Sequence, residues 1–164
     1  MIKSLGFEIF IFLGSIIEEI FPPFPSPLIV IITKMSTSPN SYSLLYLVLI
    51  AGIATIGKTF GAFILYVLGD KGEDIIVRRF GRILGISHKG LEKIGKKFSG
   101  SWKDIVILLI LRILPIIPTT PVSFMCGVIK LNLKTFIIST LIGLFVRIIA
   151  FFILVFQFSH HLCF

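Results

Sequence analysis

The chain is poor in charged residues for its length. Only 15% of its 164 residues are Asp, Glu, Lys or Arg, whereas an average soluble domain carries about 25%. Hydrophobic residues make up 55% of the sequence, and the mean hydropathy is +1.04. This composition argues against a soluble domain and indicates an integral membrane protein, whose length fits one domain.

Cysteine and histidine are scarce as well. They are Cys126, Cys163, His88, His160 and His161. Cysteines placed in an apolar segment and at the chain end predict neither a disulfide framework nor a metal site. The histidines lie in a basic stretch and in the tail, away from any nucleophile, and we expect Ser26, Thr119 and Ser123 to cap broken backbone. We therefore expect no set of catalytic residues, no metal and no cofactor, and we do not expect the protein to be an enzyme.

Two uninterrupted apolar runs are long enough to cross a bilayer, which takes about 20 residues. The sequence predicts transmembrane helices over residues 44–69 and 133–158. The apolar part of each run has one charged residue, Lys58 in the first and Arg147 in the second.

Two further apolar runs are broken by prolines. Residues 18–35 begin EEIFPPFPSP, with adjacent acids Glu18 and Glu19, and residues 105–129 contain Arg112. A proline removes an amide donor, and the carbonyl it frees must be satisfied by protein or water. We therefore predict two re-entrant hairpins, each returning to the side it entered. The expected hairpin tips contain Pro23, Pro25, Ser26, Pro115, Pro118 and Pro121.

The two halves of the chain have the same order of features. Pro23 and Pro115 are 92 positions apart, and Lys58 and Arg147 are 89 positions apart. Each half is a charged, proline-broken hairpin followed by one spanning helix, which turns the second half upside down relative to the first. The predicted fold class is thus an all-α membrane protein built as an inverted repeat. Paired, proline-interrupted segments of this kind indicate a transport site.

Basic residues concentrate between the halves. Residues 71–104 hold nine lysines or arginines and four acids, with apolar residues at helical spacing. We expect a basic amphipathic segment, broken at Gly85 and Ser87, on the cytoplasmic face of a multi-pass cell-membrane protein. Orientation explains these charges, so we expect no nucleic-acid partner. Residues 4–20 are expected to form a short retained helix, because Glu8 interrupts the apolar run and no A-x-A-like cleavage site precedes Glu18.

Several motifs together resemble the DedA family of VTT-domain membrane proteins, over roughly residues 12–150. EEIFPPFPSP is similar to the family pattern E-N-x-x-P-P-x-P-S-E. The glycine-rich stretch GKTFGAFILYVLG resembles the G-x-x-x-G and Y-x-x-G patterns, and LRILPIIP resembles R-x-x-P-x-x-P. The residues that carry the match are Glu18, Gly57, Gly61, Tyr66, Gly69, Arg112, Pro115 and Pro118.

The chain also departs from the family pattern. Glu19 stands where the family has Asn, Pro27 replaces the second acid, and the second arginine of the bacterial form R-x-x-P-x-x-R is absent. The resemblance therefore does not extend to a two-arginine headgroup clamp. Family members usually have a further C-terminal helix, so a chain that stops at Phe164 is expected to be a short or truncated member.

The resemblance implies translocation of a phosphate-bearing lipid, such as polyprenyl phosphate or a phospholipid, between leaflets. Charged side chains inside a membrane usually face a protein interior and have partners. The candidate substrate and proton-binding residues are Glu18, Glu19, Lys58, Arg112 and Arg147. Arg112 would bind phosphate bidentately, and one of the acids would carry a proton.

Three alternatives stay open at this stage. Glu18 and Arg112 could form a structural ion pair between the hairpins. The protein could be an antiporter of protons or small cations, or an assembly factor that transports nothing. Membrane lipids are the expected partners, and a homodimer through Gly57 and Gly61 is left open.

Overall fold

A computed structural model describes residues 2–21, 25–37, 43–84, 102–114 and 118–162. These residues form helices and no strand, as the sequence predicted. The helices are α1 (Ile2–Ile20), α2 (Leu28–Thr37), α3 (Leu44–Leu84), α5 (Trp102–Ile113), α6 (Thr119–Val128) and α7 (Leu133–Leu162).

Two helices are long and apolar enough to cross a membrane. The stretches Leu45–Gly72 of α3 and Leu133–Val155 of α7 have mean hydropathies of 1.9 and 2.6. They correspond to the predicted spans 44–69 and 133–158. However, α3 continues to Leu84, because no proline interrupts the sequence there. The first part of the basic segment 71–104 is therefore an extension of α3, and its expected break at Gly85 and Ser87 lies outside the described residues.

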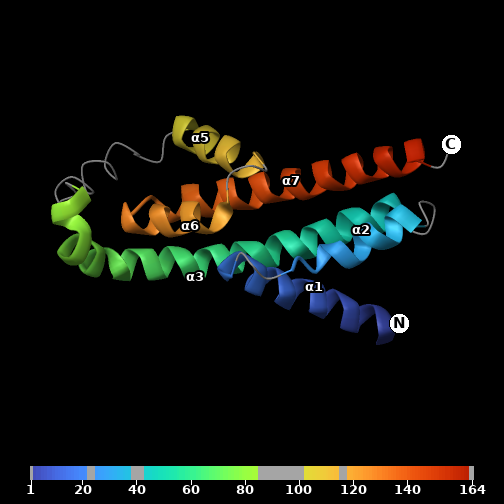
Figure 1. The fold of residues 1–164 in the computed structure, drawn as a ribbon, viewed down its shortest axis with the longest axis horizontal. Helices are drawn as coiled ribbons and strands as arrows, with labels where there is room; N and C mark the ends of the chain where they lie inside the picture. The colour runs from blue at the N-terminus through green and yellow to red at the C-terminus, as the bar shows by residue number, and fades with distance from the viewer. Residues whose placement is uncertain (1, 22–24, 38–42, 85–101, 115–117, 163–164) are drawn as a thin grey trace.

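The chain reverses direction at both proline clusters. α1 and α2 run in opposite directions, and so do α5 and α6, and in each pair the end of the first helix and the start of the second lie near the middle of the molecule (Figure 1). α1 ends at Ile20, shortly before Pro22, and α6 begins directly after Pro118, whose backbone is extended. Prolines thus end one helix and precede the next, because they disfavour helical backbone before them and tolerate a helix after them.

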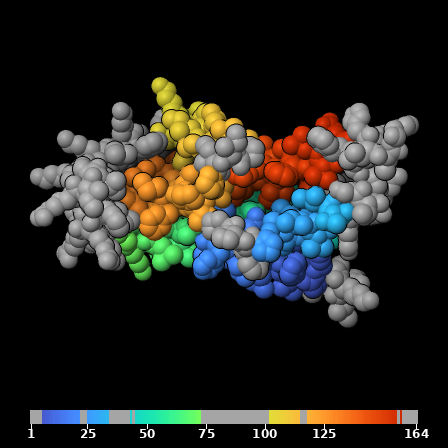
Figure 2. Space-filling model, in the orientation of Figure 1, coloured from blue at the N-terminus to red at the C-terminus, as the bar shows by residue number. Residues whose placement is uncertain are grey.

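The helices pack in a crossed pattern. α1 and α6 pack on α3, whereas α5 and α2 pack on α7, and α3 and α7 pack on each other. In Figure 2, α2 and α6 lie on the same face in opposite halves of the molecule. One apolar cluster surrounds Ile11, Ile50 and Ile148, and a second surrounds Leu108 and Phe136. Each cluster joins both halves of the chain, so the two hairpins and the two long helices form one core.

Glycines allow α1 to approach α3 closely. A Cβ atom on Gly57 would lie 2.5 Å from the carbonyl oxygen of Phe12, and one on Gly61 would lie 2.8 Å from that of Ile16. Small residues permit such close contact between membrane helices. Gly57 and Gly61 therefore serve a contact inside the chain, and α1 covers the face that we considered for a dimer.

Candidate functional site

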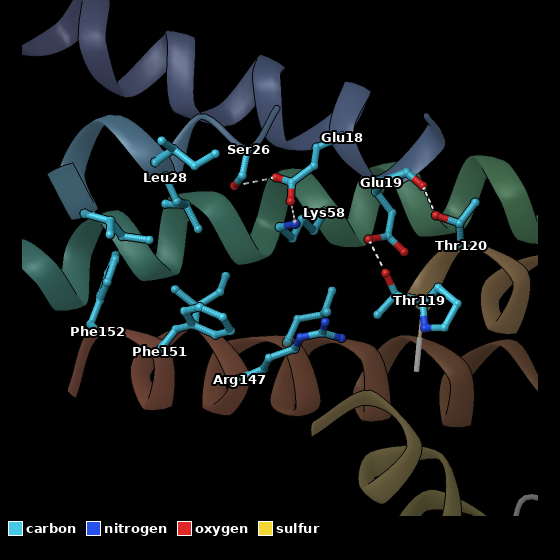
Figure 3. Close-up of a pocket in the computed structure, with 15 residues that line it drawn as sticks. Glu18, Glu19, Ser26, Leu28, Lys58, Thr119, Thr120, Arg147, Phe151 and Phe152 are labelled. Carbon is cyan, nitrogen blue, oxygen red and sulfur yellow. Dashed lines mark hydrogen bonds and ion pairs between the residues drawn. The ribbon is translucent and has the colours of Figure 1, made fainter. Parts of the chain in front are cut away.

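A cavity of about 320 Å³ lies where α1, α2, α3, α7 and the start of α6 meet (Figure 3). Its lining divides into a polar and an apolar set. The polar set is Glu18, Glu19, Ser26, Lys58, Thr119, Thr120 and Arg147. The apolar set is Leu28, Ile29, Ile32, Pro118, Leu144, Ile148, Phe151 and Phe152.

Glu18 pairs with the lone cation of the apolar part of α3. Its Oε1 atom lies 2.6 Å from Nζ of Lys58, and its Oε2 atom accepts a hydrogen bond of 3.0 Å from Ser26. The expected alternative of an ion pair between Glu18 and Arg112 is therefore wrong. Neighbouring residues on a helix point about 100° apart, so Glu18 faces α3 while Glu19 faces α6.

Glu19 connects α1 to the first turns of α6. The side chain is 1% exposed, and its Oε2 atom accepts a hydrogen bond of 2.8 Å from Thr119. Its backbone oxygen accepts a bond of 2.7 Å from Thr120, and its Oε1 atom lies 3.3 Å from the hydroxyl of Ser123. Three hydroxyls of one helix thus converge on one residue of another, which ties the two hairpins together.

Arg147 reaches the cavity from α7, on the opposite side from Glu18 (Figure 3). The side chain is half-buried and interacts electrostatically with Glu19 and Glu18. Lys58 and Arg147 are the charged residues at matching places in the two long helices, and the structure brings both to one cavity. Two cations and two carboxylates therefore line its polar part.

Arg112 lies behind the cavity rather than in its lining. It is 0% exposed, its Nη2 atom is 3.2 Å from the hydroxyl of Ser123, and its guanidinium lies 5.0 Å from the ring centre of Phe136. Within the described part of the chain, its Nε and Nη1 atoms have no hydrogen-bond partner. The structure therefore places four of the five predicted charged residues at the cavity, and links the fifth to Glu19 through Ser123.

The predicted hairpin tips are partly described. Ser26 and Pro118 line the cavity, and Pro25 and Pro121 are exposed. Pro23 and Pro115 lie outside the described residues. We expected Thr119 and Ser123 to cap broken backbone, and Ser123 does donate to the backbone oxygen of Thr119. The hydroxyl of Thr119, however, binds the Glu19 carboxylate.

Sequence reasoning missed Thr120 and the apolar half of the cavity. A pair of threonines directly after Pro118 was the available signal for Thr120, because threonine side chains at a helix start are suited to hydrogen bonds with backbone groups. The apolar residues gave no signal, since they resemble any others in a hydrophobic run. Across the described residues, no group of three or more His, Cys, Asp or Glu side chains is placed to hold a metal ion.

Comparison with known proteins agrees with a helical membrane protein that has a charged interior cavity. The family model of the VTT domain matches residues 24–157. The chain belongs to this family, the DedA or SNARE-associated family, and is a membrane protein.

Two curated relatives are similar over 132 residues, which is 77% of this chain. Both are named "Alkaline phosphatase-like protein", come from Lactococcus lactis subsp. lactis and subsp. cremoris, and are 30% identical to it. The match covers 59% of each relative, so the chain corresponds to little more than half of their length. No solved structure matches the chain.

Proposed function

We propose that the protein moves a lipid with a phosphate headgroup between the two leaflets of the membrane. The observation that carries this proposal is a single cavity with cationic side chains in its polar part and a lining of aliphatic and aromatic side chains beside them. An amphiphile with an anionic headgroup and a hydrocarbon tail is likewise divided into a charged part and an apolar part, which match the two parts of the lining. The cavity volume of about 320 Å³ falls within the ~300–1,000 Å³ range of small-molecule sites.

The headgroup would bind between Lys58 and Arg147. Arg147 offers a planar guanidinium that can bind phosphate through two parallel hydrogen bonds, and Lys58 offers a compact point charge. Both cations already interact with carboxylates, so a phosphate has to compete with Glu18 and Glu19. That competition allows binding and release, and it gives a proton a place to bind when a carboxylate loses its cation.

The hydrocarbon chain would lie along α2 and α7. Leu28 and Ile32 line this side from α2, and Ile148, Phe151 and Phe152 line it from α7. α7 carries residues of both sets, since Arg147 and Phe151 lie about one turn apart on it, so a single ligand can contact both.

The packing pattern supports the predicted inverted repeat. In an inverted repeat, α1 would correspond to α5, α2 to α6 and α3 to α7. The contact of α1 with α3 then corresponds to that of α5 with α7. The contact of α6 with α3 likewise corresponds to that of α2 with α7, and all four contacts are present. We interpret the turns at the prolines as re-entrant tips on this basis. Inverted repeats with binding sites at the repeat interface are common in transporters.

Reconstitution into liposomes tests the proposal. The assay follows inward movement of a fluorescent polyprenyl phosphate and, separately, of the same chain ending in an alcohol. We expect protein-dependent movement of the phosphate and not of the alcohol. Arg147→Met should reduce the rate at least about tenfold, the effect of losing a charge-assisted hydrogen bond. Lys134→Met, which removes an exposed lysine from the same helix, should not.

The other outcomes assign different functions. Proton flux without lipid movement would contradict lipid transport and favour the antiporter. Absence of both would favour the assembly factor. Release of inorganic phosphate from the lipid would instead favour hydrolysis, the activity suggested by the name of the Lactococcus relatives.

A further inference from the structure

We infer that Glu19 closes the cavity toward α6, and that the contact between α1 and α6 opens and re-forms as the lipid passes. This inference rests on the proposed function and assigns Glu19 the role of a positioning residue. The α1–α6 junction is defined here as Glu19 with Thr119, Thr120 and Ser123. It lies at one edge of the cavity, where Glu19, Thr119 and Thr120 belong to the lining.

The junction joins two helices end to end along α3. Glu19 is in the last turn of α1, and Thr119 and Thr120 are the first residues of α6. Glycines let both helices pack closely on α3. A Cβ on Gly61 would lie 2.8 Å from that of Glu19, and one on Gly69 would clash with the carbonyl oxygen of Phe124. Each helix is thus anchored on α3 independently of the other.

The junction itself has little apolar packing. α1 and α6 meet over a much shorter stretch than either of them shares with α3. What joins them is the set of hydrogen bonds from Thr119 and Thr120 to Glu19, together with the approach of Ser123. Hydrogen bonds can break and re-form without creating a void in a packed core, so this contact can open while both helices stay on α3.

Electrostatic attraction favours the position of the Glu19 carboxylate at the junction in the absence of a ligand. The Glu19 carboxylate faces Lys58 on α3, Arg112 on α5 and Arg147 on α7, while Glu18 is its neighbour on α1. It also lies at the N-terminus of α6, where the helix dipole favours a negative charge.

Binding of a headgroup would weaken this hold. A phosphate next to Lys58 and Arg147 takes up part of the positive charge that attracts Glu19, and it also repels the carboxylate. Arrival of the substrate therefore favours opening of the junction, which links occupancy of the cavity to access beyond it.

Cys126 provides a native reporter of the opening. It lies on α6, one turn beyond Ser123, and is 4% exposed. Because Cys126 is buried next to the junction, we expect opening of the junction to admit a water-soluble thiol reagent from the cavity to it. In a Cys163→Ser background, Thr119→Val and Glu19→Ala should each raise the labelling rate at least about tenfold, because each removes a hydrogen bond to a charged group. The two changes together should add nothing further, since both break the same contact.

The matched control is Thr59→Val, which removes a hydroxyl that bonds only within its own helix. It should leave the labelling rate unchanged. Melting temperatures show whether each variant is folded, and Glu19→Gln, which keeps an acceptor for Thr119, should restore part of the protection. Unchanged labelling in both folded variants, or effects that multiply when combined, would overturn the inference.

A second arm separates this inference from the proposed function. Polyprenyl phosphate added to the Cys163→Ser protein should raise the labelling rate of Cys126, whereas the alcohol of the same chain should not. Suppose that labelling is faster in the Thr119→Val and Glu19→Ala variants, but the phosphate lipid has no effect and no lipid moves in liposomes. That result would contradict lipid transport and would still support the α1–α6 junction as a barrier to Cys126. Lipid movement with Cys126 unreactive in every variant would contradict only the junction.

Discussion

Nζ of Lys58 lies 2.6 Å from a carboxylate oxygen of Glu18, which places an ion pair inside the contact between α1 and α3. The two side chains are 13% and 19% exposed, and both line the cavity. A pair in this position is less solvated than a surface pair but not fully desolvated. It can contribute to folding, to binding of a ligand, or to both, and these roles can be separated by changing each charge alone and then both.

Neutralising one member of the pair should destabilise the protein. Lys58→Met leaves the Glu18 carboxylate without its cation, and Glu18→Gln leaves the ammonium without its anion. We expect each to lower the free energy of unfolding by about 1–3 kcal/mol, between the values for surface and buried pairs. The double variant should recover most of this loss, as measured by denaturant unfolding in detergent.

Lipid movement distinguishes a structural pair from a binding site. If Lys58 binds the headgroup, the stable double variant stays inactive in liposomes. Recovery of transport along with stability would show that the pair only supports the fold.

Arg112→Lys should impair the protein although the charge is kept. A lysine ammonium cannot stack as a plane on the ring of Phe136, and it has to reach Ser123 from a different angle. The expected loss is about 1–2 kcal/mol of unfolding free energy, the size of a desolvated cation–π contact, together with slower lipid movement. Lys103→Arg, the reverse exchange at an exposed position of α5, should change neither. Wild-type stability and transport in Arg112→Lys would contradict a role for the guanidinium plane.

Two glycines of α3 should respond in opposite ways to alanine. In Gly57→Ala the new methyl group would meet the carbonyl oxygen of Phe12 at 2.5 Å, so α1 must shift and stability should fall by about 1–3 kcal/mol. At Gly52 the added carbon would have no neighbour within 4 Å apart from the adjoining residues and backbone of its own helix, and alanine should stabilise the helix by about 0.5–1 kcal/mol. Thermal unfolding of both variants measures the difference, and equal effects would contradict the close packing of α1 on α3.

The sequence was sufficient to predict the long helices and to single out the charged residues that line the cavity. Lys58 and Arg147 stand out because each is the only charge in an apolar run, and a cation at membrane depth needs a polar partner. Both do line the cavity. The prolines also marked the ends of helices correctly, because the effect of proline on helical backbone is local and does not depend on the fold.

Partner choice could not be predicted in the same way. A pair of Glu18 with Arg112 was one of the alternatives left open by the sequence. Glu18 pairs with Lys58 instead, because α1 packs along α3, and Glu19 is the acid that faces α6. The direction of two adjacent side chains depends on the rotation of α1 about its axis. That rotation is set by contacts such as Phe12 with Gly57, which a linear sequence does not reveal.

The orientation of α3 in the membrane gives the last prediction. Its apolar stretch, Leu45–Gly72, is followed by the basic segment, and positive residues next to a span favour the cytoplasmic side. The Tyr66 hydroxyl donates to the carbonyl oxygen of Leu131, so the chain just before α7 lies near the same end of this apolar stretch as Lys71. In a chain lacking Cys126 and Cys163, cysteines replacing the exposed Lys71 and Asn132 should react with an impermeant thiol reagent only after the membrane has been permeabilised. A cysteine at Ser43 should react with an impermeant reagent in intact cells. Labelling of the Ser43 and Asn132 positions from the same side would contradict both the spanning of α3 and the cytoplasmic position predicted for residues 71–104.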